Sequence, residues 1–320
     1  MIKIIGLGDI MPGGIISGKK EGWVNADVVE LLHSADIRVG TLECAIGNEP
    51  TFYYEKMKRL ADVIYAPDHD LEKLTTLGID IVSLANNHFF DLGPEGAGHT
   101  IKLLDDMGIA HIGAGRNLEE ANAPVVKVID GKTVAFVAFC DWRNETVGWC
   151  PFATTTQPGV NPMKDDYVVQ VIKSLKAEYD YVVVMPHWGV ENTWTTTNHV
   201  YALAKKMMKA GADIILGSHP HRVQPVVQYG NKIVAYSLGN FLFPDRLICK
   251  PRSTYYSSKK IDLDKLPRTD AYPYVGEVTY KAWKPLANIG MITEIIIDKN
   301  MQYMYHQTLM GEAVRKLNVS

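Results

Sequence analysis

Residues 212–221 are Ala212-Asp213-Ile214-Ile215-Leu216-Gly217-Ser218-His219-Pro220-His221. An apolar run of this length, followed at once by glycine, serine and proline, predicts a buried strand that ends in a tight turn. The turn carries His219 and His221, and neutral imidazoles on a fixed backbone can bind one metal ion or two adjacent ions. Taken alone, the stretch is equally well interpreted as a surface loop that binds nothing.

Similar apolar runs recur along the chain, and stretches with helical periodicity separate many of them. The other predicted strands are 2–7, 37–42, 79–84, 125–129, 134–139, 181–185, 233–236 and 291–297. Helices are predicted over 26–32 behind Asn25, from Pro94 towards Met107, over 164–178, and over 199–210, where Gly211 ends the helix. Because strands and helices alternate for most of the chain, we expect an α/β fold.

Two turns indicate that the sheets are not purely parallel. Asp130-Gly131 and Gly230-Asn231 each separate strand-like runs, as in antiparallel hairpins, so we expect mixed sheets that could form two packed layers. No linker divides the sequence, and we expect one domain over 1–320. Within it, 244–285 is rich in Pro, Tyr, Ser and Lys and is interpreted as an inserted lid or partner-binding excursion, or else as a solvated loop.

The composition is that of an ordinary globular protein. Hydrophobic residues make up 47% and charged residues 22% of the 320 residues, and the formal net charge is -3, which gives no electrostatic footprint for nucleic acid. Cys44, Cys140, Cys150 and Cys249 form no Cys-x-x-Cys pair and suggest free thiols. The N-terminus resembles a strand rather than a signal peptide, and no run approaches the ~18 apolar residues of a membrane span. We therefore expect a cytoplasmic location.

Residues of metal-ligand type follow five of the predicted strands. They are Asp9, Glu43, the Asn86-Asn87-His88 triplet, His187, and the pair His219 and His221. Because ligands of α/β proteins bind beyond the carboxyl ends of strands, we expect these side chains to gather. Two carboxylates, an amide oxygen and three imidazoles suit Zn, Mn, Fe or Ni, and suffice for two divalent ions. Singly, Asp9 could cap a turn, His187 could be a core histidine, and the asparagines could form a left-handed turn.

The motifs together resemble a known family, the CapA/PgsA-type proteins of poly-γ-glutamate capsule synthesis, within the calcineurin-like metallophosphoesterase superfamily. The resemblance covers about residues 1 to 243 and rests on Gly8-Asp9-Ile10-Met11, Leu42-Glu43, Ala85-Asn86-Asn87-His88-x-x-Asp91-x-Gly93, Gly113-Ala114-Gly115, His187-Trp188-Gly189-x-Glu191, Gly211-Ala212-Asp213, His219-Pro220-His221 and Ser237-Leu238-Gly239-Asn240-Phe241. It implies a four-layer α/β/β/α sandwich of two packed mixed sheets.

The resemblance also implies roles for individual residues. Asp9 and His221 would bind a first metal, Glu43 would bridge, and Asn87, His187 and His219 would bind a second. His88 would act as general acid or oxyanion donor, with Asp91 fixing its tautomer. Alternatively, Asp91 caps the helix near Pro94. The remaining candidates are substrate-contacting or supporting residues, each with a structural alternative: Asn86, Trp188 as a wall of the site, Glu191, Arg222 and Asn240.

Some positions depart from these patterns. Met11 stands where metallophosphoesterases usually have histidine, although the capsule family shares this methionine, so the first metal site lacks an imidazole. Glu43 replaces a shorter bridging aspartate, again as in the capsule family. Thr41 stands where that family commonly has asparagine, and 192–199 lacks the usual proline and glutamine. We therefore expect altered substrate contacts around a retained metal core.

Two classes of function follow from this sequence. The first is a metal-dependent hydrolase that cleaves a phosphoester, or a related acyl or amide bond such as a γ-glutamyl amide, in a small molecule or an anionic polymer. The alternative is an accessory, polymer-binding protein of poly-γ-glutamate synthesis or export, for which the sequence offers neither an anchor nor a continuous basic groove. A metal-binding regulatory module would leave His88 and Asp91 without a purpose.

Overall fold

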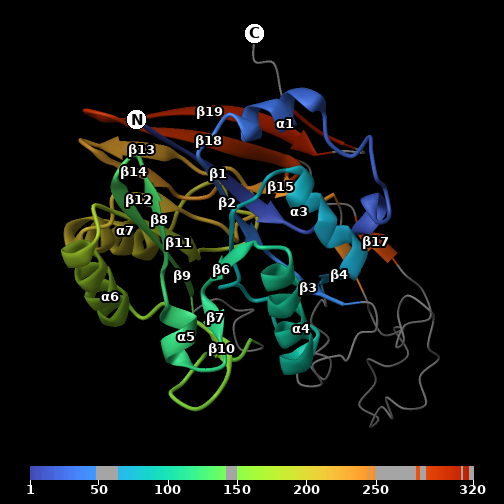
Figure 1. Ribbon diagram of the computed structural model, residues 1–320, viewed down its shortest axis with the longest axis horizontal. Helices are drawn as coiled ribbons and strands as arrows, with labels where there is room; N and C mark the ends of the chain where they lie inside the picture. Colours follow the sequence, from blue (N-terminus) through green and yellow to red (C-terminus); the bar gives the residue numbers. More distant parts are fainter. Residues whose placement is uncertain are drawn as a thin grey trace.

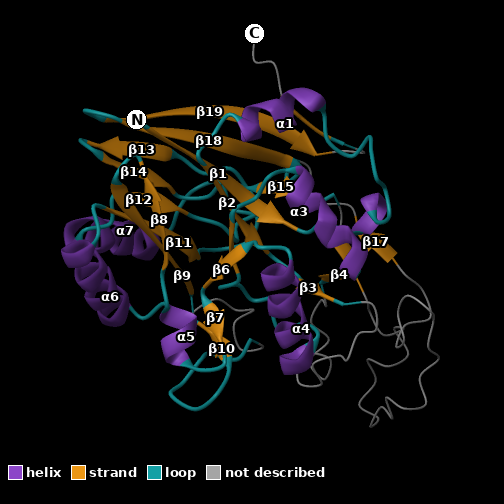
Figure 2. Cartoon of the chain, viewed as in Figure 1, coloured by secondary structure: helices purple, strands orange, loops and turns teal. Residues whose placement is uncertain are grey.

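The computed structural model describes residues 1–47, 64–141, 150–244, 246–248, 279–281, 286–310 and 313–316. Two sheets lie at the centre of the molecule and helices cover its outside (Figures 1 and 2). The predicted α/β sandwich of two mixed sheets is confirmed. None of the described helices is both long enough and apolar enough to cross a membrane.

The first sheet has eight strands in the order β20-β19-β18-β1-β2-β5-β6, with β15 also paired to β1. They are β1 (Ile2–Ile10), β2 (Ile37–Leu42), β5 (Ile81–Ser83), β6 (Ala110–Ile112), β15 (Asn240–Leu242), β18 (Ile289–Ile297), β19 (Met301–Met310) and β20 (Val314–Lys316). The run β1-β2-β5-β6 is parallel, whereas β18, β19 and β20 continue it as an antiparallel arm.

The second sheet has six strands in the order β13-β14-β12-β11-β9-β8. They are β8 (Val125–Ile129), β9 (Lys132–Cys140), β11 (Tyr181–His187), β12 (Ile214–Leu216), β13 (Val226–Tyr229) and β14 (Lys232–Ala235). Its four central strands are parallel, and the two edge strands are the antiparallel partners in the predicted hairpins. In the first hairpin, Asp130 (φ 51°) and Gly131 (φ 72°) both take the left-handed conformation of a type I′ turn.

The α-helices are α1 (Ala26–His33), α3 (Glu72–Thr76), α4 (Gly93–Asp106), α5 (Leu118–Asn122), α6 (Asp165–Glu178) and α7 (Asn198–Ala210). Short 3-10 turns are η1 (Gly14–Ile16) and η2 (Asp68–Leu71). Thr197 caps α7 by accepting a hydrogen bond from the Val200 N–H at 3.2 Å, and Gly211 (φ 128°) ends it. Asn25 occupies the N-cap position of α1 as expected, but its side chain makes no capping hydrogen bond.

The second sheet is buried on both faces, because alternate residues of its strands enter different cores. In β11, Val183 packs into the core between the two sheets, whereas Val182 and Val184 pack under α6 and α7. The two sheets approach closely where Gly6 of β1 faces Leu216 of β12. A Cβ atom on Gly6 would lie 2.8 Å from Leu216 Cδ1.

Three small two-stranded sheets complete the described structure. They are β3 (Ala45–Ile46) with β4 (Tyr65–Ala66), β7 (Ala114–Gly115) with β10 (Gly159–Val160), and β16 (Arg246–Ile248) with β17 (Thr279–Lys281). Apart from β16 and β17, most of the expected excursion over 244–285 lies outside the described residues. Its role as a lid, and the single domain over 1–320, therefore stay predictions.

Candidate metal centre

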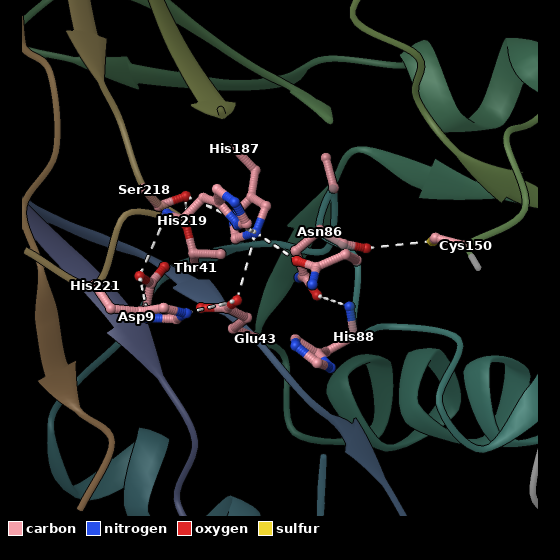
Figure 3. Close-up of polar contacts among 12 residues, drawn as sticks. Asp9, Thr41, Glu43, Asn86, His88, Cys150, His187, Ser218, His219 and His221 are labelled. Carbon is pink, nitrogen blue, oxygen red and sulfur yellow. Dashed lines mark hydrogen bonds and ion pairs between the residues drawn. The ribbon is translucent and has the colours of Figure 1, made fainter. Parts of the chain in front are cut away.

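The six predicted ligand side chains meet at the carboxyl ends of strands from both sheets. Figure 3 labels all of them except Asn87. Asp9 is the last residue but one of β1, Glu43 follows β2 and Asn87 follows β5, while His187 ends β11 and the two remaining histidines follow β12. All six are at most 2% exposed: Asp9, Glu43, Asn87, His187, His219 and His221. Strand order and parallel direction thus bring together residues that are far apart in the sequence.

A close approach of two backbone segments fixes Asp9. Its N–H donates to Gly239 O at 2.9 Å, and Asp9 pairs in register with Asn240 of β15. A Cβ atom on Gly8 would lie 1.9 Å from Gly239 O, so glycine is required there.

The turn with the two histidines has an unusual backbone. His219 (φ 95°) and His221 (φ 52°) both have positive φ, a conformation that costs non-glycine residues about 1–3 kcal/mol each. As a result, the two imidazole rings contact different residues of the centre. His219 Nδ1 lies 3.1 Å from His187 Nε2, whereas His221 Nδ1 lies 3.4 Å from Asp9 Oδ2.

The side chains form two potential ligand groups that share one carboxylate. One group is Glu43, His187 and His219, and the other is Asp9, Glu43 and His221; in each, the ligand atoms lie within 4.8 Å of one another. Glu43 Oε1 lies 3.4 Å from His187 Nε2 and 3.6 Å from His221 Nε2. Asn87 Oδ1 lies 2.8 Å from His187 Nε2 and adds an amide oxygen to the first group.

The donor atoms fit divalent cations. Both carboxylate oxygens of Glu43 and Oδ1 of Asp9 are buried and accept no hydrogen bond from the described residues. Leaving carboxylate oxygens buried without partners costs several kcal/mol unless a cation compensates them. Imidazole nitrogens and carboxylate oxygens together suit Zn, Mn, Fe or Ni.

Burial and neighbouring groups shift the pKa values of the centre, and the shifts of its histidines favour metal binding. Burial lowers the pKa of His187 to about 4 and lowers that of His219 as well, so both rings are neutral and can offer lone pairs. Burial, followed by the nearby Asp9, raises the pKa of Glu43 well above its usual value. For Asp9, burial favours a higher pKa, but contact with His221 outweighs it and the net pKa is lowered. The negative charges of the centre therefore repel each other without a cation.

Hydrogen bonds behind the centre orient two of the imidazoles. His187 Nδ1 lies 2.9 Å from Ser218 Oγ, and the Thr41 hydroxyl donates to the same oxygen at 3.2 Å. His221 Nδ1 lies 2.9 Å from Asn240 Oδ1, while the Asn240 amide donates to a backbone carbonyl. Such contacts fix which ring nitrogen faces a metal. Asn240 was among the predicted residues, whereas Ser218 was missed, and its only signal was its place beside His219.

His88 lies on the Glu43 side of the cluster in Figure 3. Its Nδ1 lies 2.8 Å from Asp91 Oδ2, which also accepts the Ile64 N–H at 2.6 Å. Helix α4 has Leu92 at its N-cap position, so the alternative in which Asp91 caps this helix is wrong. Asn86 holds the loop in place, because its Oδ1 accepts the His88 N–H and its amide donates to a carbonyl of β2.

Other predicted residues lie around the centre or away from it. The expectation that Trp188 forms a wall of the site is wrong: it packs in the core under α6 and α7, and its indole N–H donates to Tyr236 O at 2.8 Å. Strand alternation turns it away from His187.

Glu191 is half-buried. Its negative charge favours higher pKa values for His187 and His219, whereas burial of these histidines favours lower values. Arg222 is buried, with its Cζ 4.8 Å from the ring centroid of Trp194.

Met11 does not replace the missing histidine in the described structure. Its side chain is buried, and its sulfur accepts the Gly13 N–H at 3.2 Å. The ligand group of Asp9, Glu43 and His221 therefore has a single imidazole, from His221.

Comparisons with known proteins show the family of this chain and support its fold. The family model of the bacterial capsule synthesis protein PGA_cap matches residues 3–245. The capsule biosynthesis protein CapA of Bacillus anthracis is 33% identical over 245 residues, which are 74% of this chain and 58% of that protein. The PGA biosynthesis protein CapA of Bacillus subtilis (strain 168) is 29% identical over 245 residues, 74% of this chain and 62% of that protein. The chain thus spans about three fifths of the length of these two relatives.

A solved structure supports the fold alone. The putative 5'-nucleotidase from Staphylococcus aureus has a TM-score of 0.52 and 13% identity, over 98% of this chain and 54% of that one. At this identity the likeness says nothing about substrate. The family match over 3–245 covers all six predicted ligand residues, and it shows that the chain belongs to the bacterial capsule synthesis protein family PGA_cap.

Proposed function

We propose that this protein is a metal-dependent hydrolase that cleaves a phosphoester or a related acyl or amide bond with the help of two divalent ions. The single observation that carries the proposal is the pair of ligand groups that share Glu43, whose buried carboxylate oxygens have no hydrogen-bond donor among the described residues. A site built only for structure would satisfy those oxygens with protein donors.

Each residue of the centre has a place in this proposal. Asp9 and His221 would hold the first ion, Asn87, His187 and His219 would hold the second, and Glu43 would bind both. Two such ions, when bound, polarise the scissile group and supply a nucleophile at neutral pH. Ser218 and Asn240 keep His187 and His221 in the tautomers that present their other nitrogen to the centre.

His88 is the proposed proton donor to the leaving group. Asp91 accepts a hydrogen bond from its Nδ1, which fixes the ring so that Nε2 would be the nitrogen that protonates a departing oxygen or nitrogen. The His88 side chain is 8% exposed and belongs to neither ligand group, so it can act on substrate without binding a metal. Asn86 supports it through the His88 backbone.

A second candidate function is binding of an anionic capsule polymer without cleavage. It is favoured by the names of the relatives, which describe capsule and PGA biosynthesis rather than a hydrolytic reaction. The same two cations could hold carboxylates or phosphates of a polymer. The two candidate functions differ in their need for His88 and Asp91, because hydrolysis requires a proton donor and binding does not.

Elemental analysis of the purified chain, followed by hydrolysis assays, tests the proposal. We expect two Mn, Zn, Fe or Ni ions per chain and metal-dependent turnover within a panel of p-nitrophenyl phosphate, phosphodiesters and γ-glutamyl amides. Metal binding with no turnover on any of these, combined with tight binding of a γ-glutamyl polymer, would establish the second candidate instead.

A further inference from the structure

A small hollow lies where the segment after η1 meets η2 and α3, and α3 is on the outside of the molecule (Figure 1). The hollow has a volume of about 220 Å³. Three lysines line it, Lys19, Lys20 and Lys73, together with the acidic residues Asp70 and Glu72. Among the described residues that line it, none is a predicted ligand of the metal centre. The hollow is therefore a second place at which this chain can bind a ligand.

Lys73 is a buried cation with donors to spare. It is 5% exposed, and its ammonium lies 5.9 Å from the ring centroid of Trp23, which is also buried. An ammonium has three N–H donors. Among the described residues, only Asp70 accepts a hydrogen bond from it. Because buried donors without acceptors cost free energy, oxygen atoms that enter the hollow would be held there.

Asp70 ties the segment after η1 to α3. Its carboxylate is completely buried and accepts the Ser17 hydroxyl at 2.6 Å, the Gly18 N–H at 2.9 Å and the Lys73 ammonium. Gly18 (φ 69°) has the left-handed backbone that glycine favours. Asp70 is thus satisfied by protein donors and acts as a positioning residue, which keeps the segment with Lys19 at the hollow.

The other two lysines have no anionic partner. Lys19 and Lys20 are exposed, and neither forms an ion pair or a side-chain hydrogen bond with the described residues. Since Asp70 already compensates Lys73, these two charges are available to a ligand. Glu72 is exposed, so water screens its carboxylate.

The charges and donors of the hollow define the ligand that it fits. A phosphate group carries nearly two negative charges at neutral pH and has three or more acceptor oxygens. It can therefore pair with two free ammonium groups and also accept hydrogen bonds from a third. Lysine binds phosphate as a point charge and needs no planar geometry. A single carboxylate has one charge and two oxygens, and would leave more of these donors without acceptors.

We infer that the hollow between the segment after η1 and α3 binds a phosphate dianion, either free or at the end of a small phosphomonoester. Lys73 donates to it from the buried side, and Lys19 and Lys20 pair with its charge. The inference does not rest on the proposed function, because the lysines belong to neither ligand group of the metal centre.

Isothermal titration calorimetry on the metal-loaded chain tests the inference with three probes: inorganic phosphate, methylphosphonate and glutarate. Methylphosphonate represents a phosphomonoester, because a phosphoesterase does not cleave its C–P bond. We expect both phosphorus probes to bind more tightly than glutarate, and the tighter of the two indicates the source of the ligand. The double variant Lys19→Gln/Lys20→Gln should weaken that binding by about 5- to 30-fold, the range for two exposed charge pairs. Phosphate held at the metal ions is common to both proteins, so only their difference counts.

Lys209→Gln/Lys299→Gln is the matched control, since both lysines are exposed, do not line the hollow and change the net charge by the same amount. Phosphate should raise the Tm of the wild type and of this control more than that of the Lys19→Gln/Lys20→Gln variant. Equal phosphate affinity in the wild type and the Lys19→Gln/Lys20→Gln variant, or glutarate binding as tight as that of phosphate, would overturn the inference. Lysine-dependent phosphate binding by a chain that hydrolyses none of the substrate panel would count against the proposed hydrolase only.

Discussion

His187 Nε2 lies 3.4 Å from Glu43 Oε1, although His187 ends a strand of the second sheet and Glu43 follows a strand of the first. This contact places the centre in the seam between the sheets rather than on one of them. Each proposed metal site therefore depends on how the two sheets pack, and Glu43 is the residue through which the two sites are coupled.

Glu43→Gln should reduce bound metal from two ions to at most one per chain, because an amide cannot bridge two cations as a carboxylate does. We expect hydrolysis to fall at least about 100-fold, the scale for removal of one electrostatic group from an active site. The thermal stability of the metal-free protein should not fall, since burial already raises the pKa of Glu43 and favours its neutral form. Metal content and calorimetry measure both effects, with the exposed Glu30→Gln as control. Two tightly bound ions in the variant would refute the bridging role.

His88→Ala should leave two metal ions bound and reduce turnover by about 10²–10⁴, the usual contribution of a proton donor. Asp91→Asn should have a smaller effect in the same direction, because it disturbs only the orientation of the ring. The control is His99→Ala, which removes a histidine paired with Asp68 at the surface. If His88→Ala loses metal, His88 is a ligand and the assignment is wrong.

Ser218→Ala should weaken binding of one ion by about 10- to 100-fold, as for other partners that orient a metal-binding histidine. The variant removes the hydroxyl that lies 2.9 Å from His187 Nδ1 and frees the ring to turn. Competition with a chelator measures the affinity, and Ser174→Ala on the exposed side of α6 is the control. Equal affinities in the variant and the wild type would show that the backbone alone orients His187.

Acid should destabilise the metal-free protein through His187. Burial lowers its pKa to about 4, whereas an unfolded histidine titrates near 6.5. Between these values the unfolded chain binds a proton that the folded chain excludes, so stability is lost as pH falls from about 6.5 to about 4, by up to roughly 3 kcal/mol. The raised pKa of Glu43 acts in the opposite direction.

His187→Gln separates the two effects, because it removes the imidazole and keeps Glu43. Across this pH window, the free energy of unfolding, measured with denaturant, should fall more in the wild type than in this variant. Parallel curves for the two proteins would mean that His187 does not titrate in this way.

Gly8→Ala should destabilise the fold by at least about 2 kcal/mol, because its Cβ would lie 1.9 Å from Gly239 O and the backbone beside Asp9 would have to move. Gly98→Ala is the contrasting change: it lies in α4 with nothing within 4 Å, and should stabilise by about 0.5–1 kcal/mol. Thermal unfolding measures both. A tolerated Gly8→Ala with normal metal content would show that the contact with Gly239 is not needed.

The sequence predicted the elements that have strong local patterns. The observed β2 (Ile37–Leu42) and β8 (Val125–Ile129) have the predicted bounds, and α6 and α7 differ by one residue at their starts. The short strand β15 (Asn240–Leu242) and the polar strand β19 (Met301–Met310) were missed. A strand of three residues has too little periodicity to be recognised, and β19 has no run of apolar residues.

For the site, the sequence by itself determined which residue types stand at the ends of which strands, because an apolar run followed by a ligand residue is a local feature. Only the tertiary structure decided that Ser218 stands behind His187 and that Trp188 turns into the other core. These relations join neighbouring strands or opposite faces of one strand, so they depend on strand order, register and the left-handed backbone of His219 and His221, which no local pattern encodes.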